Sequence, residues 1–137
     1  MAVDVPGFQG GYICRGAEIK GWNKISEPRR LTPDFMAAVA SEYDVFINMS
    51  RFDAQATTVL EAMSWGFPIA CTPQSGYSDE PDVFKLDLEN NKKNIAMIEV
   101  LQKLPDEALR SISERNRSAV VSEYNWKQFV STVLSEI

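Results

Sequence analysis

The stretch 44–71 constrains the fold more than any other part of the chain. The short apolar run directly after Asp44 is typical of a buried strand, and helical apolar spacing begins after Thr57. Gly66 ends this helix, Pro68 follows it, and a second apolar run occupies 69–71. Because consecutive parallel strands need a crossover between them, this order of strand, helix and strand predicts a right-handed parallel unit of an α/β fold.

Helix signals also flank this unit. Thr32, Pro33 and Asp34 supply a cap, a first-turn proline and a first-turn acid in the expected order, and this helix should end near Tyr43. The C-terminal third is predicted to contain three helices. The first has its apolar positions at Ile95, Ile98 and Leu101. The second opens at 105–107 and has its apolar positions at Leu109, Ile112, Ala119 and Val120. The third follows the capping pair Asn125 and Gln128, and its apolar positions are Trp126, Phe129, Val130, Val133, Leu134 and Ile137.

The N-terminal residues carry weaker signals. Glycines and a proline in 1–11 predict a disordered segment, and 12–14 and 17–22 are each predicted to form a short strand. A length of 137 residues favours one domain. We therefore predict a single, partial Rossmann-like domain over 1–137, with a small parallel sheet flanked by helices and a helical C-terminus.

Composition excludes several classes of function. The formal net charge of −5 argues against a surface for nucleic acid, which needs clustered Lys and Arg. The chain has no histidine, which excludes histidine acid–base catalysis and most zinc sites, and we expect neither a metal nor a cofactor. Cys14 and Cys71 lie beside apolar neighbours, which favours reduced thiols and the cytoplasm. No apolar stretch approaches the roughly 18 residues that span a bilayer.

The loop between the predicted strand and helix is the candidate binding site. A helix start presents unpaired amides at the positive end of its dipole, which favours a phosphate or pyrophosphate. Asp53 stands at the loop entrance and Glu61 about one turn into the helix, so both carboxylates can accept hydrogen bonds from one hydroxyl-rich ligand. The candidate amide donors are those of Ala54, Gln55, Ala56, Thr57 and Thr58.

Each of these charged residues also has a purely structural interpretation. Thr58 and Glu61 fit the capping-box pattern, in which Glu61 bonds the backbone of Thr58. Asp53 fits a loop aspartate that bonds its own backbone. Arg29 and Arg30 are interpreted as part of a solvated loop, with a phosphate clamp as the alternative. Taken singly, these residues leave structural and ligand-binding roles open.

The block as a whole resembles one enzyme family. Met49-Ser50 follows the strand, Asp53 and Glu61 are separated by seven residues, and Glu61 opens the run Glu-Ala-Met-Ser-Trp-Gly-Phe-Pro-Ile-Ala. These features are similar to the acidic-x7-Glu signature of family 4, or group 1, glycosyltransferases of the GT-B fold. Asn125-Trp126 resembles the aromatic-Trp pair before that family's final helix. Together the matches cover most of the chain.

The resemblance implies a donor site for a nucleotide-diphospho-sugar, built on UDP or GDP, and transfer with retention of anomeric configuration. Glu61 would bond the ribose. Asp53 is the implied catalytic residue, in contact with donor-sugar hydroxyls near the reacting carbon. The amides of Ala56, Thr57 and Thr58 would hold the diphosphate, whose developing negative charge a helix start stabilises.

Three departures from the family pattern matter. Asp53-Ala54 replaces the family's Glu-Gly, which shortens the reach of the carboxylate and stiffens the loop. Of the Gly-Gly pair after the second strand only Gly76 is matched, and it is a further candidate ligand residue. Arg15 and Lys20-Gly21 resemble the family's Gly-Arg…Lys-Gly phosphate segment, but too few residues separate them from Asp44 for the intervening crossovers. We therefore expect the basic residues that grip the diphosphate to be absent.

Two hypotheses of function follow. In the first, the chain is the donor-binding domain of a retaining glycosyltransferase of polysaccharide biosynthesis, inactive alone because the acceptor-binding domain is missing from it. In the second, it is a non-catalytic nucleotide-binding or scaffolding module with a Rossmann-like fold. An apolar stripe beginning at Trp126 predicts homo-oligomers where it is exposed. The expected location is the cytoplasm, with the inner face of the membrane for a full-length enzyme.

Overall fold

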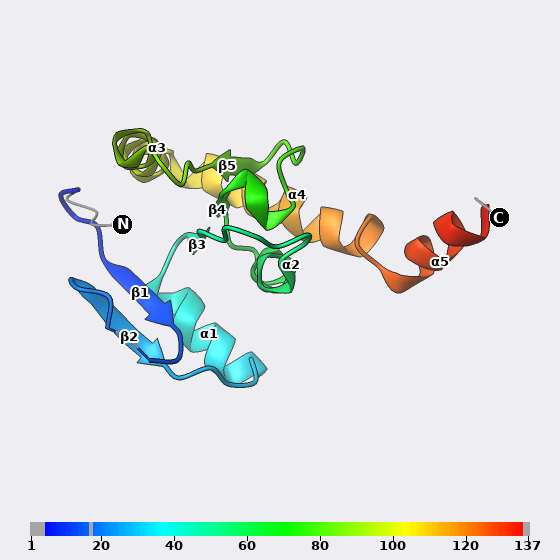
Figure 1. Ribbon diagram of the computed structural model, residues 1–137, viewed down its shortest axis with the longest axis horizontal. Coiled ribbons are helices and arrows are strands. Elements are labelled where there is room, and N and C mark those ends of the chain that lie inside the picture. Colours follow the sequence, from blue (N-terminus) through cyan, green and yellow to red (C-terminus); the bar gives the residue numbers. More distant parts are fainter. Residues whose placement is uncertain (1–4, 17, 136–137) are drawn as a thin grey trace.

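The protein is an α/β structure with two small parallel sheets flanked by helices (Figure 1). The computed structural model describes residues 5–16 and 18–135. Its strands are β1 (Gly10–Ile13), β2 (Trp22–Ser26), β3 (Phe46–Asn48), β4 (Ile69–Cys71) and β5 (Val83–Lys85). Its helices are α1 (Pro33–Glu42), α2 (Thr57–Ser64), the short 3-10 helix η1 (Pro73–Ser75), α3 (Asn91–Lys103), α4 (Asp106–Ser122) and α5 (Trp126–Ser135).

The larger sheet has the strand order β3-β4-β5, with every neighbouring pair parallel. The predicted parallel unit is therefore confirmed, with β3 and β4 joined through α2. All of β4 is buried because it lies between the other two strands, whereas β3 is half-buried at the sheet edge. The apolar run after Asp44 was predicted to be a buried strand, and this is wrong in degree, because β3 is only half-buried.

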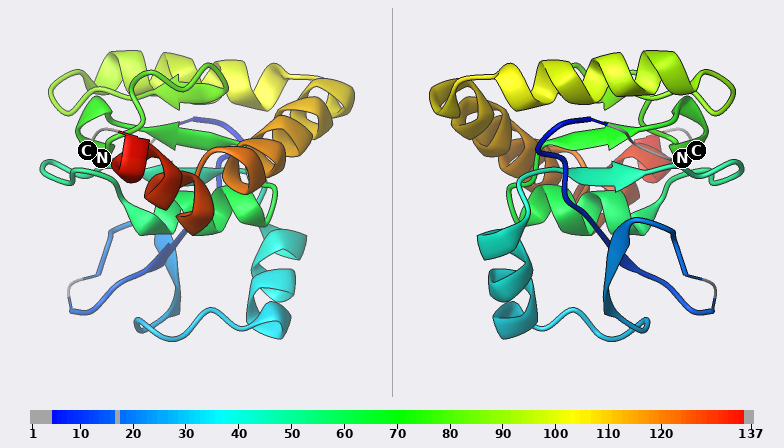
Figure 2. Two further views of the ribbon diagram at one scale, coloured as in Figure 1. Left: turned by 90° about the vertical axis from the view of Figure 1, so that its right-hand side faces the viewer. Right: turned by 90° about the vertical axis from the view of Figure 1, so that its left-hand side faces the viewer.

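Alternate side chains of β4 enter two separate apolar cores, one on each face of the sheet. Ile69 and Cys71 pack with Val59 and Met63 of α2, whereas Ala70 packs with Leu101 of α3. Figure 2 shows α2 and α3 on opposite sides of the strands. The result is a three-layer arrangement of the Rossmann-like kind, in which both faces of a parallel sheet are covered by helices.

The predicted helix boundaries agree with the structure. The Thr32 hydroxyl accepts a hydrogen bond from the Phe35 amide at 3.4 Å, and α1 ends one residue before Tyr43. Gly66 adopts the left-handed conformation at φ 83° directly after the end of α2. Its α-carbon also lies against α4, since a β-carbon there would stand 2.5 Å from the Ser113 hydroxyl.

The N-terminal strands differ from their predictions. The strand predicted for 17–22 was placed too early, because β2 begins at Trp22 and runs to Ser26. Gly21 stands directly before it with φ 81°, a conformation incompatible with an extended strand. Residues 1–4 and 17 lie outside the described residues, and β1 takes in Gly10 and Gly11, the last two residues of the segment predicted to be disordered.

Candidate functional site

The candidate site lies where β3 and β4 end at their carboxyl edges. Residues 49–56 connect β3 to α2, and residues 72–77 run from β4 through η1. Two backbone hydrogen bonds hold these loops together, from the Asp53 amide to the Gln74 carbonyl and from the Ala56 amide to the Ser75 carbonyl, both at 3.0 Å. The carboxyl ends of parallel strands are the usual ligand edge of an open α/β sheet.

The first turn of α2 has no side-chain cap. The cap position is Ala56, so Thr57 and Thr58 are the first two helical residues. The alternative capping-box interpretation of Thr58 and Glu61 does not hold, because Thr58 is already inside the helix and no side chain caps this end. The structural interpretation of Glu61 loses its basis.

The structure divides the five predicted amide donors into two groups. The Gln55 amide donates to Asp53 Oδ1 at 3.1 Å, and the Ala56 amide donates to the Ser75 carbonyl at 3.0 Å. Within the described part of the chain, the amides of Ala54, Thr57 and Thr58 have no hydrogen-bond acceptor. Only these three remain able to donate to a ligand without breaking a bond of the fold.

The two carboxylates have different local environments. Asp53 is exposed and forms the local bond to Gln55 that the sequence offered as its structural interpretation. Glu61 is exposed, and its carboxylate makes no hydrogen bond or ion pair with any described residue. Glu61 lies three and four residues after Thr58 and Thr57, so the three share one face of α2. Within the described chain no hydrogen bond joins Asp53 to Glu61.

Gly76 fixes the approach of the two loops. It has φ 89°, and a β-carbon there would stand 2.1 Å from the Ala54 carbonyl oxygen. Only glycine fits this position, because both the conformation and the close backbone contact exclude a side chain. Gly76 was predicted as a ligand residue, and the structure places it against the loop that carries Asp53.

A polar network beneath the loops was missed by the sequence analysis. Asn48 Oδ1 accepts from the Ser50 amide at 2.9 Å and from the Ser75 hydroxyl at 2.8 Å, and the Thr72 hydroxyl donates to the Ser50 carbonyl at 2.6 Å. Thr72 and Ser75 are fully buried. No local pattern reveals this network, since its members lie 22 and 27 residues apart in the sequence.

Tyr77 adds a second buried anchor that the sequence analysis missed. Its hydroxyl donates to the Ala56 carbonyl at 2.9 Å, directly before the first turn of α2. Burial raises the pKa of Tyr77 to about 12, and the nearby charge of Asp53 acts in the same direction. The phenol therefore remains protonated and able to donate throughout the neutral range.

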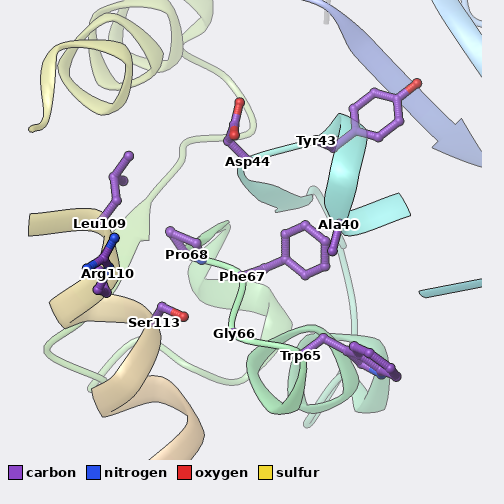
Figure 3. Close-up of a pocket in the computed structure, with 10 residues that line it drawn as sticks. All are labelled: Ala40, Tyr43, Asp44, Trp65, Gly66, Phe67, Pro68, Leu109, Arg110 and Ser113. Carbon is purple, nitrogen blue, oxygen red and sulfur yellow. The ribbon is translucent and has the colours of Figure 1, made fainter. Parts of the chain in front are cut away.

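A hollow of about 250 Å³ lies away from this edge, near the end of α2 (Figure 3). It is lined by Tyr43, Asp44, Phe67 and Arg110, among others, and none of the predicted site residues reaches it. Arg29 lies 4.7 Å from the centre of the Phe35 ring, and Arg29 and Arg30 are both exposed, as expected of a solvated loop.

Within the described residues, no helix has both the length and the apolar character needed to cross a bilayer. No family model matches the chain, and no solved structure matches it. The chain is similar to a protein named sucrose synthase from Denitrovibrio acetiphilus, with 29% identity over 115 residues. The match covers 78% of this chain and 14% of that protein's length. This weak similarity hints at the GT-B glycosyltransferases, in agreement with the resemblance of the 44–71 segment.

Proposed function

We propose that the chain is the donor-binding domain of a retaining glycosyltransferase of the family 4, or group 1, type. The observation that carries the proposal is the start of α2. It is uncapped at the carboxyl edge of a parallel sheet, and Glu61 stands exposed one turn further along the same face. The similarity to a sucrose synthase supports the same class of reaction.

Each residue of the site receives a role that its bonds allow. The amides of Thr57 and Thr58 hold the diphosphate, with the positive end of the α2 dipole behind them. Glu61 accepts hydrogen bonds from the ribose hydroxyls. Asp53 contacts donor-sugar hydroxyls through the oxygen that does not bond Gln55. Ala56 contributes its helix-cap position rather than its amide, which the fold already uses.

Departure of the nucleoside diphosphate is the chemical step that this arrangement assists. As the bond to the sugar breaks, negative charge grows on the diphosphate, and unpaired amides at a helix start stabilise that charge. The acceptor would be supplied by a second, N-terminal GT-B domain, so the 137 residues alone are not expected to catalyse transfer. Polysaccharide biosynthesis in the cytoplasm, or at the inner membrane face, is the proposed setting.

Calorimetric titration with UDP, GDP and their sugar conjugates tests the proposal. We expect binding of at least one of them, and a loss of about tenfold in affinity for Glu61→Gln, because a charge-assisted hydrogen bond is removed. Glu99→Gln is the matched control, since Glu99 is a helical glutamate on α3, remote in sequence from the loops. Absence of binding at millimolar ligand, or equal affinities for both variants, contradicts the donor site.

A non-catalytic nucleotide-binding or scaffolding module is the second candidate. One observation favours it: two of the five predicted amide donors are already bonded within the fold, which weakens the anion site. Asp53→Asn separates the candidates, because it keeps the acceptor for the Gln55 amide and removes the charge. In Asp53→Asn, a nucleotide-binding module would retain its affinity for both UDP and UDP-sugars, and a donor site would lose affinity for the sugar conjugates only. A scaffolding module would bind neither ligand, even in the wild type.

A further inference from the structure

The hydrogen bonds around Asn48 fix the direction of its side-chain amide. The Ser50 backbone amide can only donate, and it lies 2.9 Å from one terminal atom of Asn48. That atom must therefore be the oxygen, which also accepts from the Ser75 hydroxyl at 2.8 Å. The nitrogen of Asn48 must then face the other way, toward Thr58.

This orientation determines what the Thr58 hydroxyl can do. Asn48 Nδ2 lies 3.4 Å from Thr58 Oγ1, and because an amide nitrogen can only donate, the hydroxyl oxygen is the acceptor. The hydroxyl proton of Thr58 is left for another partner. Within the described chain no acceptor for it is present, and Thr58 is exposed in the first turn of α2.

The hydrogen bonds of buried Ser75 and Thr72 fix this orientation of the Asn48 amide. Ser75 is fully buried and gives its proton to Asn48, while fully buried Thr72 gives its proton to the Ser50 carbonyl. Reversing the Asn48 amide would turn its nitrogen toward the Ser50 amide, which would bring two donors together. A buried donor without an acceptor is costly, so the fold selects one orientation of Asn48.

We propose that Asn48 is a positioning residue that directs the Thr58 hydroxyl proton outward, toward an oxygen of a bound diphosphate. The inference rests on the proposed function and adds to it a side-chain donor beside the Thr57 and Thr58 amides. Asn48 itself does not touch the ligand. Its effect passes through Thr58, which becomes a donor because Asn48 occupies its oxygen.

Variants of Thr58 test the ligand side of the inference. In calorimetric titrations with UDP, GDP and inorganic pyrophosphate, we expect Thr58→Val to bind about tenfold more weakly, and Thr58→Ser to restore the affinity. Valine keeps the shape of threonine and the backbone amide, so a loss reports the hydroxyl alone. Thr132→Val is the matched control, because Thr132 is an exposed helical threonine on α5 whose hydroxyl donates only within that helix, to the Gln128 carbonyl. Affinity of Thr58→Val within twofold of the wild type would overturn the inference.

A double-variant cycle tests the role of Asn48. Asn48→Asp keeps the acceptor for the Ser50 amide and the Ser75 hydroxyl, but replaces the donor that faces Thr58. We expect Asn48→Asp to weaken binding at least tenfold in the wild type and clearly less in the Thr58→Val background. The local charge effect is common to both backgrounds, so the difference reports the hydroxyl. Asn23→Asp on β2 controls for net charge. Strict additivity would contradict the positioning role.

Nuclear magnetic resonance of the unliganded chain separates this inference from the proposed function. The side-chain amide protons of Asn48 should shift between the wild type and Thr58→Val. If no nucleotide binds the wild type, the proposed function fails and the ligand role of Thr58 is wrong, while a shift would still support the orientation. Unchanged Asn48 signals would refute the orientation whatever the chain binds.

Discussion

At the residue scale, Gly76 sets the distance between the two loops of the candidate site. A β-carbon at this position would meet the Ala54 carbonyl oxygen at 2.1 Å and the Gln55 α-carbon at 2.9 Å. Both are backbone atoms, which cannot rotate away as a side chain can. The spacing of the loops therefore depends on one missing methyl group.

We predict that Gly76→Ala destabilises the fold by about 3 kcal/mol, from left-handed strain together with the backbone clash. Gly16→Ala is a matched control, because Gly16 has φ 93° but no atom within 4 Å of a β-carbon. It should lose only the strain, about 1 kcal/mol. Urea unfolding followed by fluorescence measures both. Equal losses in the two variants would show that the loops can separate without cost.

Tyr77 predicts a pH dependence of stability. Its pKa is raised from 10.0 to about 12, mainly by burial and then by Asp53, so the folded state holds its proton more tightly than the unfolded state. The resulting stabilisation is fully present below pH 10 and is lost as the pH rises toward about 12.

The measurement is the urea midpoint between neutral pH and about pH 12, compared with that of Tyr77→Phe. The variant loses the bond to the Ala56 carbonyl, so it should be less stable at neutral pH by about 1 kcal/mol. Its further decline above pH 10 should be shallower than that of the wild type. Parallel curves for the two proteins would rule out titration of Tyr77.

At the scale of elements, the helices and the central sheet could be predicted because their signals are local. Thr32 with Pro33 marked the start of α1, and Gly66 with Pro68 marked the end of α2. The start of α2 was less accessible to sequence reasoning. The capping-box pattern at 58–61 is present in the sequence, but the hydrogen bonds of Ala56 place the helix cap two residues earlier, at Ala56 instead of Thr58.

The support of the candidate site could not be predicted at all. Asn48, Thr72 and Ser75 come together only when β3 and β4 pair, so their bonds are a consequence of tertiary structure. In the folded chain the Ala56 amide donates to the Ser75 carbonyl, whereas the sequence had predicted that this amide was free for a ligand. Residue types at a helix start therefore predicted a candidate anion site, but not how many of its amides remain unbonded.

α5 depends on its cap more than the other helices do. Its described residues include none that is buried, so tertiary packing contributes little to its stability. Asn125 Oδ1 accepts from the Gln128 amide at 2.8 Å, and its Nδ2 donates to the Val121 carbonyl at 2.9 Å. One side chain thus joins the end of α4 to the start of α5.

We predict that Asn125→Ala frays α5 while the core stays intact. Loss of a cap costs about 1 kcal/mol, and this loss is enough to unfold a helix of 10 residues that has no tertiary packing to stabilise it. Hydrogen exchange should rise throughout α5, with little change in the thermal midpoint. Asn90→Ala removes the corresponding cap of α3, but buried Ile98 and Leu101 hold that helix. Asn90→Ala should therefore lower the thermal midpoint without fraying α3. Local fraying in both variants would contradict the prediction that only α5 depends on its cap.

At the scale of the whole molecule, α5 stands apart from the sheets and carries an uncovered apolar stripe (Figure 1). Trp126 is 76% exposed and Leu134 is 67% exposed. Trp126 and Phe129 stack on one another at 5.1 Å between ring centres, which leaves their outer faces to solvent. Covering a contiguous apolar stripe of this kind with another protein surface is favourable, because it removes a large apolar area from water, whereas a single exposed apolar side chain offers little area.

We predict that the chain self-associates reversibly through this stripe, with a second copy covering the face that the first leaves open. Sedimentation velocity over a range of concentrations should show a rising mean mass for the wild type and a monomer for the double variant Phe129→Gln, Leu134→Gln. Phe52→Gln is the control, because Phe52 is 96% exposed but stands alone on the loop after β3. If the double variant still associated as the wild type does, the stripe on α5 would not be the contact, and a monomeric Phe52→Gln would place the contact on the loop after β3.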